Sequence, residues 1–510
     1  MIADVAICGG GLAGLTLALQ LRQRAPGASL VVLESSRRPL PEGCHKVGES
    51  TVEIGARYLG HVLGLHDYLL DRHLPKNGLR FFCGAPGAPI EQRSEMGPRE
   101  APRVPAYQLD RGRLENDLRE RCVEKGIDLR EGWGVRNVEI GSPHRITAVE
   151  TRTSGDPVEI AARWVIDATG RRRLLAKKLG LHEDVTPQAH AAWFRVQERV
   201  LIQELAPAAA QQWHDRDIDG NRWLSTNHLC GYGYWVWLIP LENGVTSIGL
   251  VTEAACHDYG ELSTEEALRA WIAAHEPALS ARLEGVAFAD FIAMKDYRHS
   301  ASRVLSAERW ACVGEAGIFI DPLYSPGSDF IALANTYTTE LVVDDLAGRL
   351  DPQRVDAFDA FFRDWATLIA RTTVLGSRTM RSAEVLAAKL YWDFFYYWAF
   401  MCPYYFSECW ALGPDDHERF HGMLRRFTAL NERAQTVTQA WTDLAESEPS
   451  VPFVGLPAIA TTLSDLHLAL LEKTSVDATY DAMERALGWG EELVTELLLR
   501  ALRRAGESRA

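Results

Sequence analysis

Three glycines near the start of the chain have the spacing of a phosphate-binding loop. Gly9, Gly11 and Gly14 fit the pattern G-x-G-x-x-G between an apolar run and a helical pattern. At such a turn the backbone approaches a pyrophosphate closely, and the N-terminus of the next helix favours negative charge. Glu34 ends a second apolar run, where a carboxylate binds a ribose 2′-hydroxyl and disfavours a 2′-phosphate. We therefore expect a dinucleotide cradled by Gly9, Gly11, Leu12, Ala13 and Gly14.

Two tryptophans one residue apart are the second chemical feature. Trp235 and Trp237 lie in the run YWVWLIPL, which Asn243 and Gly244 separate from the run VTSIGLVT. An Asn-Gly pair between two such runs indicates a β-hairpin, and alternate residues of a strand share one face. Two interpretations stay open here. The indoles are either ordinary packing of a sheet face or a rigid apolar wall that excludes water from a reactive site.

The elements that must position these residues form three regions. An apolar strand, a glycine turn, a helix and a second apolar strand are typical of a doubly wound α/β sheet, and later apolar runs return to it. We expect an α/β fold with a Rossmann-like domain, an inserted antiparallel β-sheet domain for the substrate and a helical C-terminal region. The expected ranges are 1–185 with 300–350, 186–299 and 351–510.

Composition and charge exclude several classes of protein. The chain has 510 residues, with 47% hydrophobic and 24% charged residues, which is ordinary for a globular protein of about two or three domains. A net charge of −15 argues against nucleic-acid binding and does not favour a membrane surface. Nine scattered cysteines form no CxxC pair, and the N-terminus has no basic leader. We expect a cytoplasmic protein without a metal site or a membrane span.

Further segments resemble the flavin-contacting motifs of glutathione-reductase-type flavoprotein monooxygenases. These segments are DATGR at 167–171, GEA at 314–316 and the following GIFIDPLYSPGSDF, with a glutamate where the family usually has an aspartate. The resemblance implies FAD as the dinucleotide and a fold like that of p-hydroxybenzoate hydroxylase. The residues that it places near FAD are Arg111, Asp167, Gly170, Gly314, Glu315, Asp321, Pro322 and Gly327.

The segment WVWLIP at 235–240 resembles the W-x-W-x-I-P signature of flavin-dependent halogenases. HKVGES at 45–50 resembles the family's Gly-Glu-Ser segment, which carries Gly48, Glu49 and Ser50 over as flavin contacts. HLPKNG at 73–78 resembles the stretch with the family's required lysine, which carries over to Lys76. Lys46 is a weaker rival, because it falls where the family tolerates substitution.

This second resemblance implies an activity. Reduced FAD and O2 form a C4a-hydroperoxide, which gives hypohalous acid, and Lys76 relays it past the tryptophans to an electron-rich aromatic or enol substrate of secondary metabolism. The family takes reduced FAD from a separate flavin reductase. Tyr324 stands where the indole branch has a glutamate, so the branch that acts on phenols and pyrroles is expected. The substrate is then a small aromatic or polyketide-like molecule, free or tethered to a carrier protein.

One position departs from the halogenase pattern. The family holds its halide with backbone N–H groups of a Ser/Thr-Gly pair, and here the pair is Pro326–Gly327. Proline has no N–H, and a lost hydrogen bond to a charged partner costs about 1.5–3 kcal/mol. Ser328 and the N–H groups after Gly327 are the alternative halide donors. A halide-independent monooxygenase or dehydrogenase therefore stays open, as does a non-catalytic flavoprotein.

The aromatic segment YWDFFYYWAFM at 391–401 has two interpretations. It is either a helix packed across the flavin domain or an apolar wall for the substrate.

Overall fold

The first sheet carries the glycine turn. In the computed structural model, which describes all residues except 1, 86, 153–154, 445–451, 457–460 and 508–510, the strand order of this sheet is β18-β19-β10-β1-β2-β7. All neighbours from β19 to β7 pair in parallel, which confirms the doubly wound sheet. The strands are β1 (Ile2–Cys8), β2 (Leu30–Glu34), β7 (Asp128–Glu131), β10 (Val158–Asp167), β18 (Leu305–Ser306) and β19 (Trp310–Cys312). Strands β8 (Trp133–Glu139) and β9 (His144–Glu150) extend from β10.

Helices α1 (Leu12–Arg24), α4 (Arg111–Glu124) and α9 (Gly327–Leu346) pack beside this sheet. Helix α1 contacts both α4 and α9, and it follows the carboxyl end of β1, where Cys8 pairs with Asp167 at the carboxyl end of β10. Ligands bind at this edge in open parallel sheets.

The second sheet is mostly antiparallel and has the order β16-β12-β15-β14-β13-β4-β5-β20. Its strands are β4 (Leu79–Cys83), β5 (Ser94–Gly97), β12 (Ala189–Val196), β13 (Thr226–Gly231), β14 (Tyr234–Pro240), β15 (Thr246–Glu253), β16 (Asp290–Met294) and β20 (Phe453–Gly455). The register pairs Pro240 with Thr246 across the Asn243–Gly244 turn, which confirms the hairpin. Three of the strands, β4, β5 and β20, come from outside residues 186–299. Strands β4 and β5 belong to an earlier segment of the chain, and β20 belongs to the C-terminal region.

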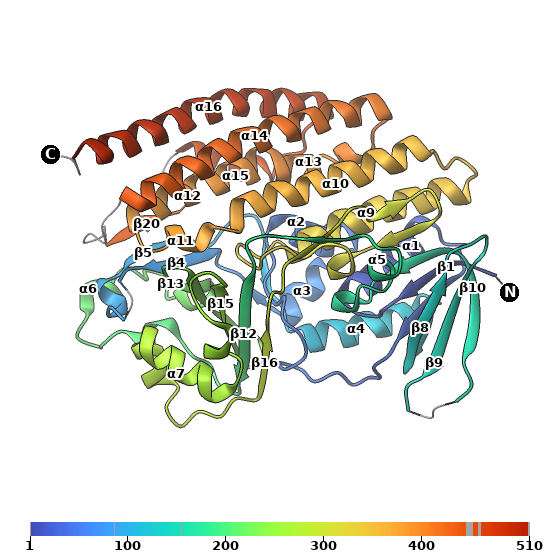
Figure 1. Cartoon of the computed structure of the whole chain (residues 1–510), viewed down its shortest axis with the longest axis horizontal. Coiled ribbons are helices and arrows are strands. Elements are labelled where there is room, and N and C mark those ends of the chain that lie inside the picture. Colours follow the sequence, from blue (N-terminus) through green and yellow to red (C-terminus); the bar gives the residue numbers. More distant parts are fainter. Residues whose placement is uncertain (1, 86, 153–154, 445–451, 457–460, 508–510) are drawn as a thin grey trace.

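The C-terminal helices form a layer along one side of both sheets (Figure 1). They are α10 (Pro352–Thr373), α11 (Gly376–Thr379), α12 (Ala383–Tyr396), a π-helical turn η8 (Tyr397–Met401), α13 (Cys402–Phe406), α14 (Pro414–Leu444), α15 (Thr461–Ala469) and α16 (Val476–Glu507). One buried hydrophobic cluster runs from β1 and α1 through α9 and α10 to α14 and α16. Within the described residues, no helix has the length and apolar character that a membrane crossing needs.

Candidate functional site

The glycine turn has the shape of a dinucleotide cradle. Gly9 has φ +117°, and a Cβ placed on it would lie 2.2 Å from the carbonyl oxygen of Ala168. A Cβ on Gly14 would lie 2.0 Å from the carbonyl oxygen of Gly9. Helix α1 has no side-chain cap and no acidic residue in its first turn, so its first N–H groups suit an anion. Side chains at these positions would close the cradle.

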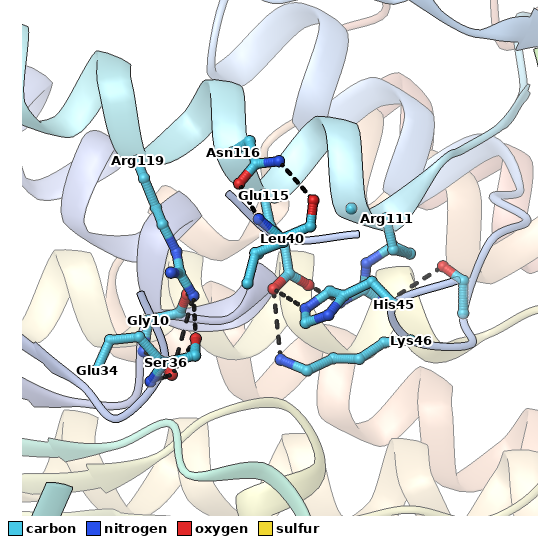
Figure 2. Close-up of polar contacts among 12 residues, drawn as sticks. Gly10, Glu34, Ser36, Leu40, His45, Lys46, Arg111, Glu115, Asn116 and Arg119 are labelled. Atoms are coloured by element: carbon cyan, nitrogen blue, oxygen red, sulfur yellow. Dashed lines mark hydrogen bonds and ion pairs between the residues drawn. The ribbon is translucent and has the colours of Figure 1, made fainter. Parts of the chain in front are cut away.

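Glu34 lies at the carboxyl end of β2 beside this cradle, as the spacing predicts (Figure 2). Its Oε2 accepts a hydrogen bond of 2.7 Å from Gly10 N–H, and its Oε1 accepts one of 2.7 Å from Ser36 N–H. Burial raises the pKa of Glu34, but these bonds and the charge of Arg119 outweigh it and hold the pKa below its usual value. The side chain is therefore a carboxylate, the form that accepts a hydrogen bond from a ribose hydroxyl.

A stripe of charged residues on α4 faces the glycine turn (Figure 2). Glu115 is buried, and its carboxylate contacts Arg111, His45 Nε2 at 3.2 Å and Lys46 Nζ at 3.3 Å. These partners, Arg111 first, hold the pKa of Glu115 well below its usual range despite burial. The Lys46 amine also lies 3.2 Å from where a Cβ on Gly11 would be. Positive charge thus gathers where a pyrophosphate would meet α1.

The glycine cradle, the Glu34 carboxylate that would bind a ribose, and the positive charges of Arg111 and Lys46 fit FAD. Sequence reasoning missed Glu115, Lys46 and Arg119 as parts of this site. The spacing of Arg111, Glu115 and Arg119 at every fourth residue was the available signal, because such residues share one face of a helix.

The Gly48-Glu49-Ser50 segment joins the two sheets. Glu49 is buried, and burial raises its pKa against the charge of Arg195 on β12, whose Nη2 lies 3.0 Å away. Ser50 Oγ lies 2.9 Å from Thr226 Oγ1 on β13 and 3.1 Å from Ser325 Oγ. This segment therefore fixes the second sheet and the loop before α9 relative to the cradle.

Arg111 at the start of α4 supports the same segment. Its Nη1 donates to the carbonyl of Val47 at 2.8 Å, and its side chain is mostly buried rather than on the surface. Gly48 has φ +88°, and a Cβ there would meet the Arg111 guanidinium at 2.8 Å.

Two of the expected flavin contacts have partners within the chain. Asp167 ends β10 and accepts hydrogen bonds from Thr169 N–H at 2.9 Å and Leu175 N–H at 2.7 Å. Asp321 pairs with Arg298, accepts from Tyr297 Oη at 3.0 Å and accepts from Leu323 N–H at 2.9 Å. These carboxylates hold the loops of Gly170 and Pro322 in shape.

Glu315 is half-buried beside the cradle. Burial raises its pKa, opposed by the charges of Arg111, Arg171 and Lys46. Its neighbour Gly314 has φ +59° and packs against Ala13 in α1, since a Cβ there would lie 3.0 Å from that methyl group.

The tryptophan pair forms a buried wall on β14. Trp235 and Trp237 are 3% and 6% exposed, with ring centroids 5.8 Å apart. The Trp237 indole lies across Gly249 on β15, where a Cβ would be 2.1 Å from the ring, and its Nε1 donates to Ser247 Oγ at 3.3 Å. Both indoles belong to a buried cluster that includes Leu323 and packs against Tyr324.

A cavity of about 360 Å³ lies beside that cluster, and Lys76 lines it. Lys76 follows β3 (Leu74–Pro75), is 4% exposed, and donates from Nζ to the carbonyl of Thr51 at 2.7 Å. Burial lowers the pKa of Lys76 to about 7, against the opposing charges of Glu53 and Asp329. A large fraction of this amine is therefore neutral at neutral pH. Among the described residues that line the cavity, neither indole appears.

Acidic groups line the cavity together with Lys76. Burial raises the pKa of Asp329 to about 7, although Tyr397 Oη donates to its carboxylate at 2.7 Å. Glu53 accepts from Trp398 Nε1 at 3.0 Å and lies 3.1 Å from His467 Nε2. Burial raises the pKa of Glu53, but the His467 contact outweighs it and leaves the pKa below its usual value.

The aromatic segment at 391–401 was interpreted either as helix packing or as a wall for the substrate, and each interpretation fits part of it. Phe394, Tyr396, Tyr397 and Trp398 line the cavity, whereas Trp392 is buried and donates to Asn431 Oδ1 on α14 at 2.8 Å. Part of the segment is thus a cavity wall and part is helix packing.

The loop before α9 has unusual backbone geometry. Tyr324 and Ser325 have φ of +69° and +61°, which costs non-glycine residues about 1–3 kcal/mol each. Pro326 precedes the first residue of α9, and Ser328 Oγ is buried with no hydrogen-bond partner among the described residues. That hydroxyl and Gly327 lie at the uncapped start of the helix, the place expected for a halide.

Within the described part of the chain, no group of three or more His, Cys, Asp or Glu residues could hold a metal ion. The nine cysteines are unpaired.

Comparison with known proteins matches residues 2–243 to the family of the FAD binding domain. Flavin-dependent halogenase chlA of Dictyostelium discoideum is 26% identical over 443 residues, which cover 79% of this chain and 71% of that protein. The 1H-pyrrole-2-carbonyl-[peptidyl-carrier protein] chlorinase of Pseudomonas fluorescens is 27% identical over 64% of this chain and 72% of its own.

Among solved structures, halogenase PltM in complex with phloroglucinol and FAD has a TM-score of 0.66 at 17% identity. The match covers 96% of both chains, so the likeness of fold includes the helical layer.

Proposed function

We propose that this chain, which is similar to flavin-dependent halogenases and matches the FAD binding domain, halogenates an electron-rich aromatic or enol substrate. The observation that carries the proposal is the buried Lys76 amine in a cavity with aromatic walls. A buried lysine with a pKa of about 7 is a nucleophile at neutral pH, which a solvated lysine is not.

Reduced FAD with O2 supplies, when bound, the oxidising equivalent that converts a halide ion to hypohalous acid. We propose that a separate flavin reductase provides it. Within this chain, the cradle of Gly9, Gly11 and Gly14 with Glu34 would hold the dinucleotide. The segment of Gly48, Glu49 and Ser50, with Arg111, would position the loops around it.

Lys76 would receive the halogen on its neutral amine or hold hypohalous acid by a hydrogen bond. The carbonyl of Thr51 accepts one N–H of the amine and so orients it. The buried indoles of Trp235 and Trp237 would exclude water and keep the oxidant from reaching the substrate by another route.

The halide would lie at the start of α9. Pro326 provides no N–H there, so the proposed donors are the Gly327 backbone and the Ser328 hydroxyl, which lacks a partner among the described residues. Pro326 also favours the second candidate function, a halide-independent monooxygenase or dehydrogenase on the same scaffold.

We propose a small hydroxylated aromatic or enol as the substrate class. A cavity of about 360 Å³ lies near the lower limit of small-molecule sites, and its walls include Phe394, Tyr397 and Trp398. Arg99 and Arg103 are exposed at the edge of the same lining, where a carrier protein would deliver a tethered substrate.

The test supplies reduced FAD through a generic flavin reductase to a panel of phenols, pyrroles and 1,3-diketones, with and without sodium bromide. We expect brominated products, detected by mass spectrometry, that require bromide. Oxygenated products formed without bromide would replace the halogenase function with the second candidate. Oxidation of reduced FAD without any product would exclude both halogenase and monooxygenase.

A further inference from the structure

A second polar group lines the cavity of Lys76, on the side formed by α12. Tyr324 and Asp393 are both lining residues, and Tyr324 Oη donates to Asp393 Oδ2 at 2.7 Å. Lys389 Nζ lies 2.8 Å from the same carboxylate oxygen, and Gln435 Nε2 donates to Oδ1 at 2.8 Å. The cavity therefore holds a tyrosine hydroxyl backed by a carboxylate whose own position is fixed.

The residues that contact Asp393 are themselves held by further hydrogen bonds. The Lys389 amine also donates to the carbonyl of Thr372 at 2.8 Å and to Gln435 Oε1 at 2.7 Å. Lys389 and Asp393 are each 1% exposed in their side chains. The hydrogen bond from Tyr324 to Asp393 connects this network to the loop before α9.

Packing alone does not account for this arrangement. A buried ion pair is often no more stable than well-packed apolar side chains of the same volume, so its presence calls for another reason. Here Asp393 lines the cavity, and it contacts Tyr324, which has φ +69° in the loop from Asp321 to Ser325. The Ser325–Ser50 contact ties that loop to the segment beside the FAD cradle.

Aromatic halogenation ends with the loss of a ring proton, which a group of this kind can accept. The halogen joins a ring carbon while its bond to the Lys76 nitrogen or to the hypohalous oxygen breaks, and that bond's electron pair stays on nitrogen or oxygen. The ring carbon then carries both halogen and hydrogen, and the ring is cationic. Loss of the proton returns the C–H electron pair to the ring and restores aromaticity.

We propose that Tyr324 accepts this ring proton on its oxygen while its own proton passes to Asp393 Oδ2. A cationic ring is a very strong acid, so a hydroxyl backed by a carboxylate is basic enough. Tyr324 is then a catalytic residue, and Asp393 and Lys389 are positioning residues that act through it. The inference rests on the proposed halogenase function.

The test uses the phenol of the panel that the wild type brominates fastest, in ordinary and ring-perdeuterated forms. In the wild type we expect proton loss to be fast and no isotope effect on bromination. In Tyr324→Phe and Asp393→Asn we expect bromination to slow by about 10²-fold, the smaller end of general acid–base contributions, and to show a normal primary isotope effect. Oxidation of reduced FAD is measured in the same reactions, so that a slower flavin reaction is distinguished from slower loss of the ring proton.

The same two substitutions at other buried positions serve as controls, because they show whether loss of any buried polar group slows bromination. Tyr337→Phe removes a buried hydroxyl that contacts Tyr404 Oη at 2.7 Å, and Asp359→Asn alters a buried carboxylate that accepts from Val304 N–H. Both should keep the wild-type rate and show no isotope effect.

Slow bromination without an isotope effect in the Tyr324 and Asp393 variants would mean a structural role and would overturn the proposal. Bromination at the wild-type rate in both variants would also overturn the proposal. If the wild type brominates nothing, the halogenase function itself fails, which is a distinct result.

Discussion

At the scale of residues, the chemistry depends on which lysine is buried. Lys46 and Lys76 both lie near expected flavin segments, but the Lys46 side chain is 48% exposed and pairs with Glu115. Lys76 is 4% exposed and lines the cavity. Burial penalises the charged form of an amine, so the two lysines have different chemistry at the same pH. Lys46 can meet a phosphate as a cation, and Lys76 can act as a neutral nucleophile.

The yield of halogenated product should depend on pH. In the proposed function Lys76 accepts a halogen only as a neutral amine. Because the pKa of Lys76 is about 7, product formation should rise as pH increases through about 7 and then level off. Glu53→Gln removes a negative charge that raises the pKa of Lys76, so the rise should move to lower pH. Product formation per unit of reduced FAD consumed, measured from pH 5 to 9, checks this. A profile that is flat, or unmoved by Glu53→Gln, would contradict a titrating Lys76.

Sequence reasoning found some of these residues and missed others for a physical reason. Gly9 and Glu34 lie within a short segment whose spacing carries the signal, whereas Lys76 was inferred from the resemblance of HLPKNG to a family motif. Asp393 and His467 reach the same cavity from helices hundreds of residues away, and no local spacing records that contact. Asp329 did leave a signal, an acid at the start of a long apolar helix.

At the scale of elements, strand β14 and its partner β15 shape the indole wall. Their hairpin was predictable from Asn243–Gly244, and the shared face of the tryptophans follows from strand geometry. The pairing of β13 with β4, and of β5 with β20, was not predictable, because strand partners distant in sequence leave no periodic signal. The sheet beside the cavity is therefore wider than the inserted region suggests.

The second prediction tests this wall. Gly249→Ala adds a methyl group where the Trp237 indole lies, and overpacking of this kind costs about 1–3 kcal/mol. We expect the indole to shift and the oxidant to escape, so that more peroxide and less halogenated product form per reduced FAD. Peroxide and product are measured together, with tryptophan fluorescence to report the shift. Unchanged coupling in a variant whose fluorescence does shift would show that the indole wall does not confine the oxidant.

At the scale of the whole molecule, the helical layer is part of the same core as the cofactor sheet. One hydrophobic cluster connects β1 and α1 to α14 and α16, and β20 extends the second sheet. The cavity draws residues from the second sheet, α9, α12 and α15. The three regions that composition and pattern suggest are therefore joined through shared packing.

The third prediction follows from this shared core. Unfolding in denaturant should be one cooperative transition, with far-ultraviolet circular dichroism and tryptophan fluorescence giving the same midpoint. Saturating FAD should raise that midpoint for both signals, because FAD binds the folded state. Two separated transitions, of which FAD moves one, would instead indicate a helical region that folds independently.

In the proposed function, the buried amine of Lys76 carries the halogen from the flavin site to the substrate. The most direct measurement compares the wild type with Lys76→Met, supplying both with reduced FAD, O2 and bromide, and quantifies brominated product and oxidised FAD in the same reaction. Lys125→Met, at an exposed lysine after α4, is the control and should match the wild type. We predict that Lys76→Met oxidises reduced FAD at the wild-type rate and forms no brominated product. Brominated product from Lys76→Met at the wild-type yield would show that Lys76 does not carry the halogen.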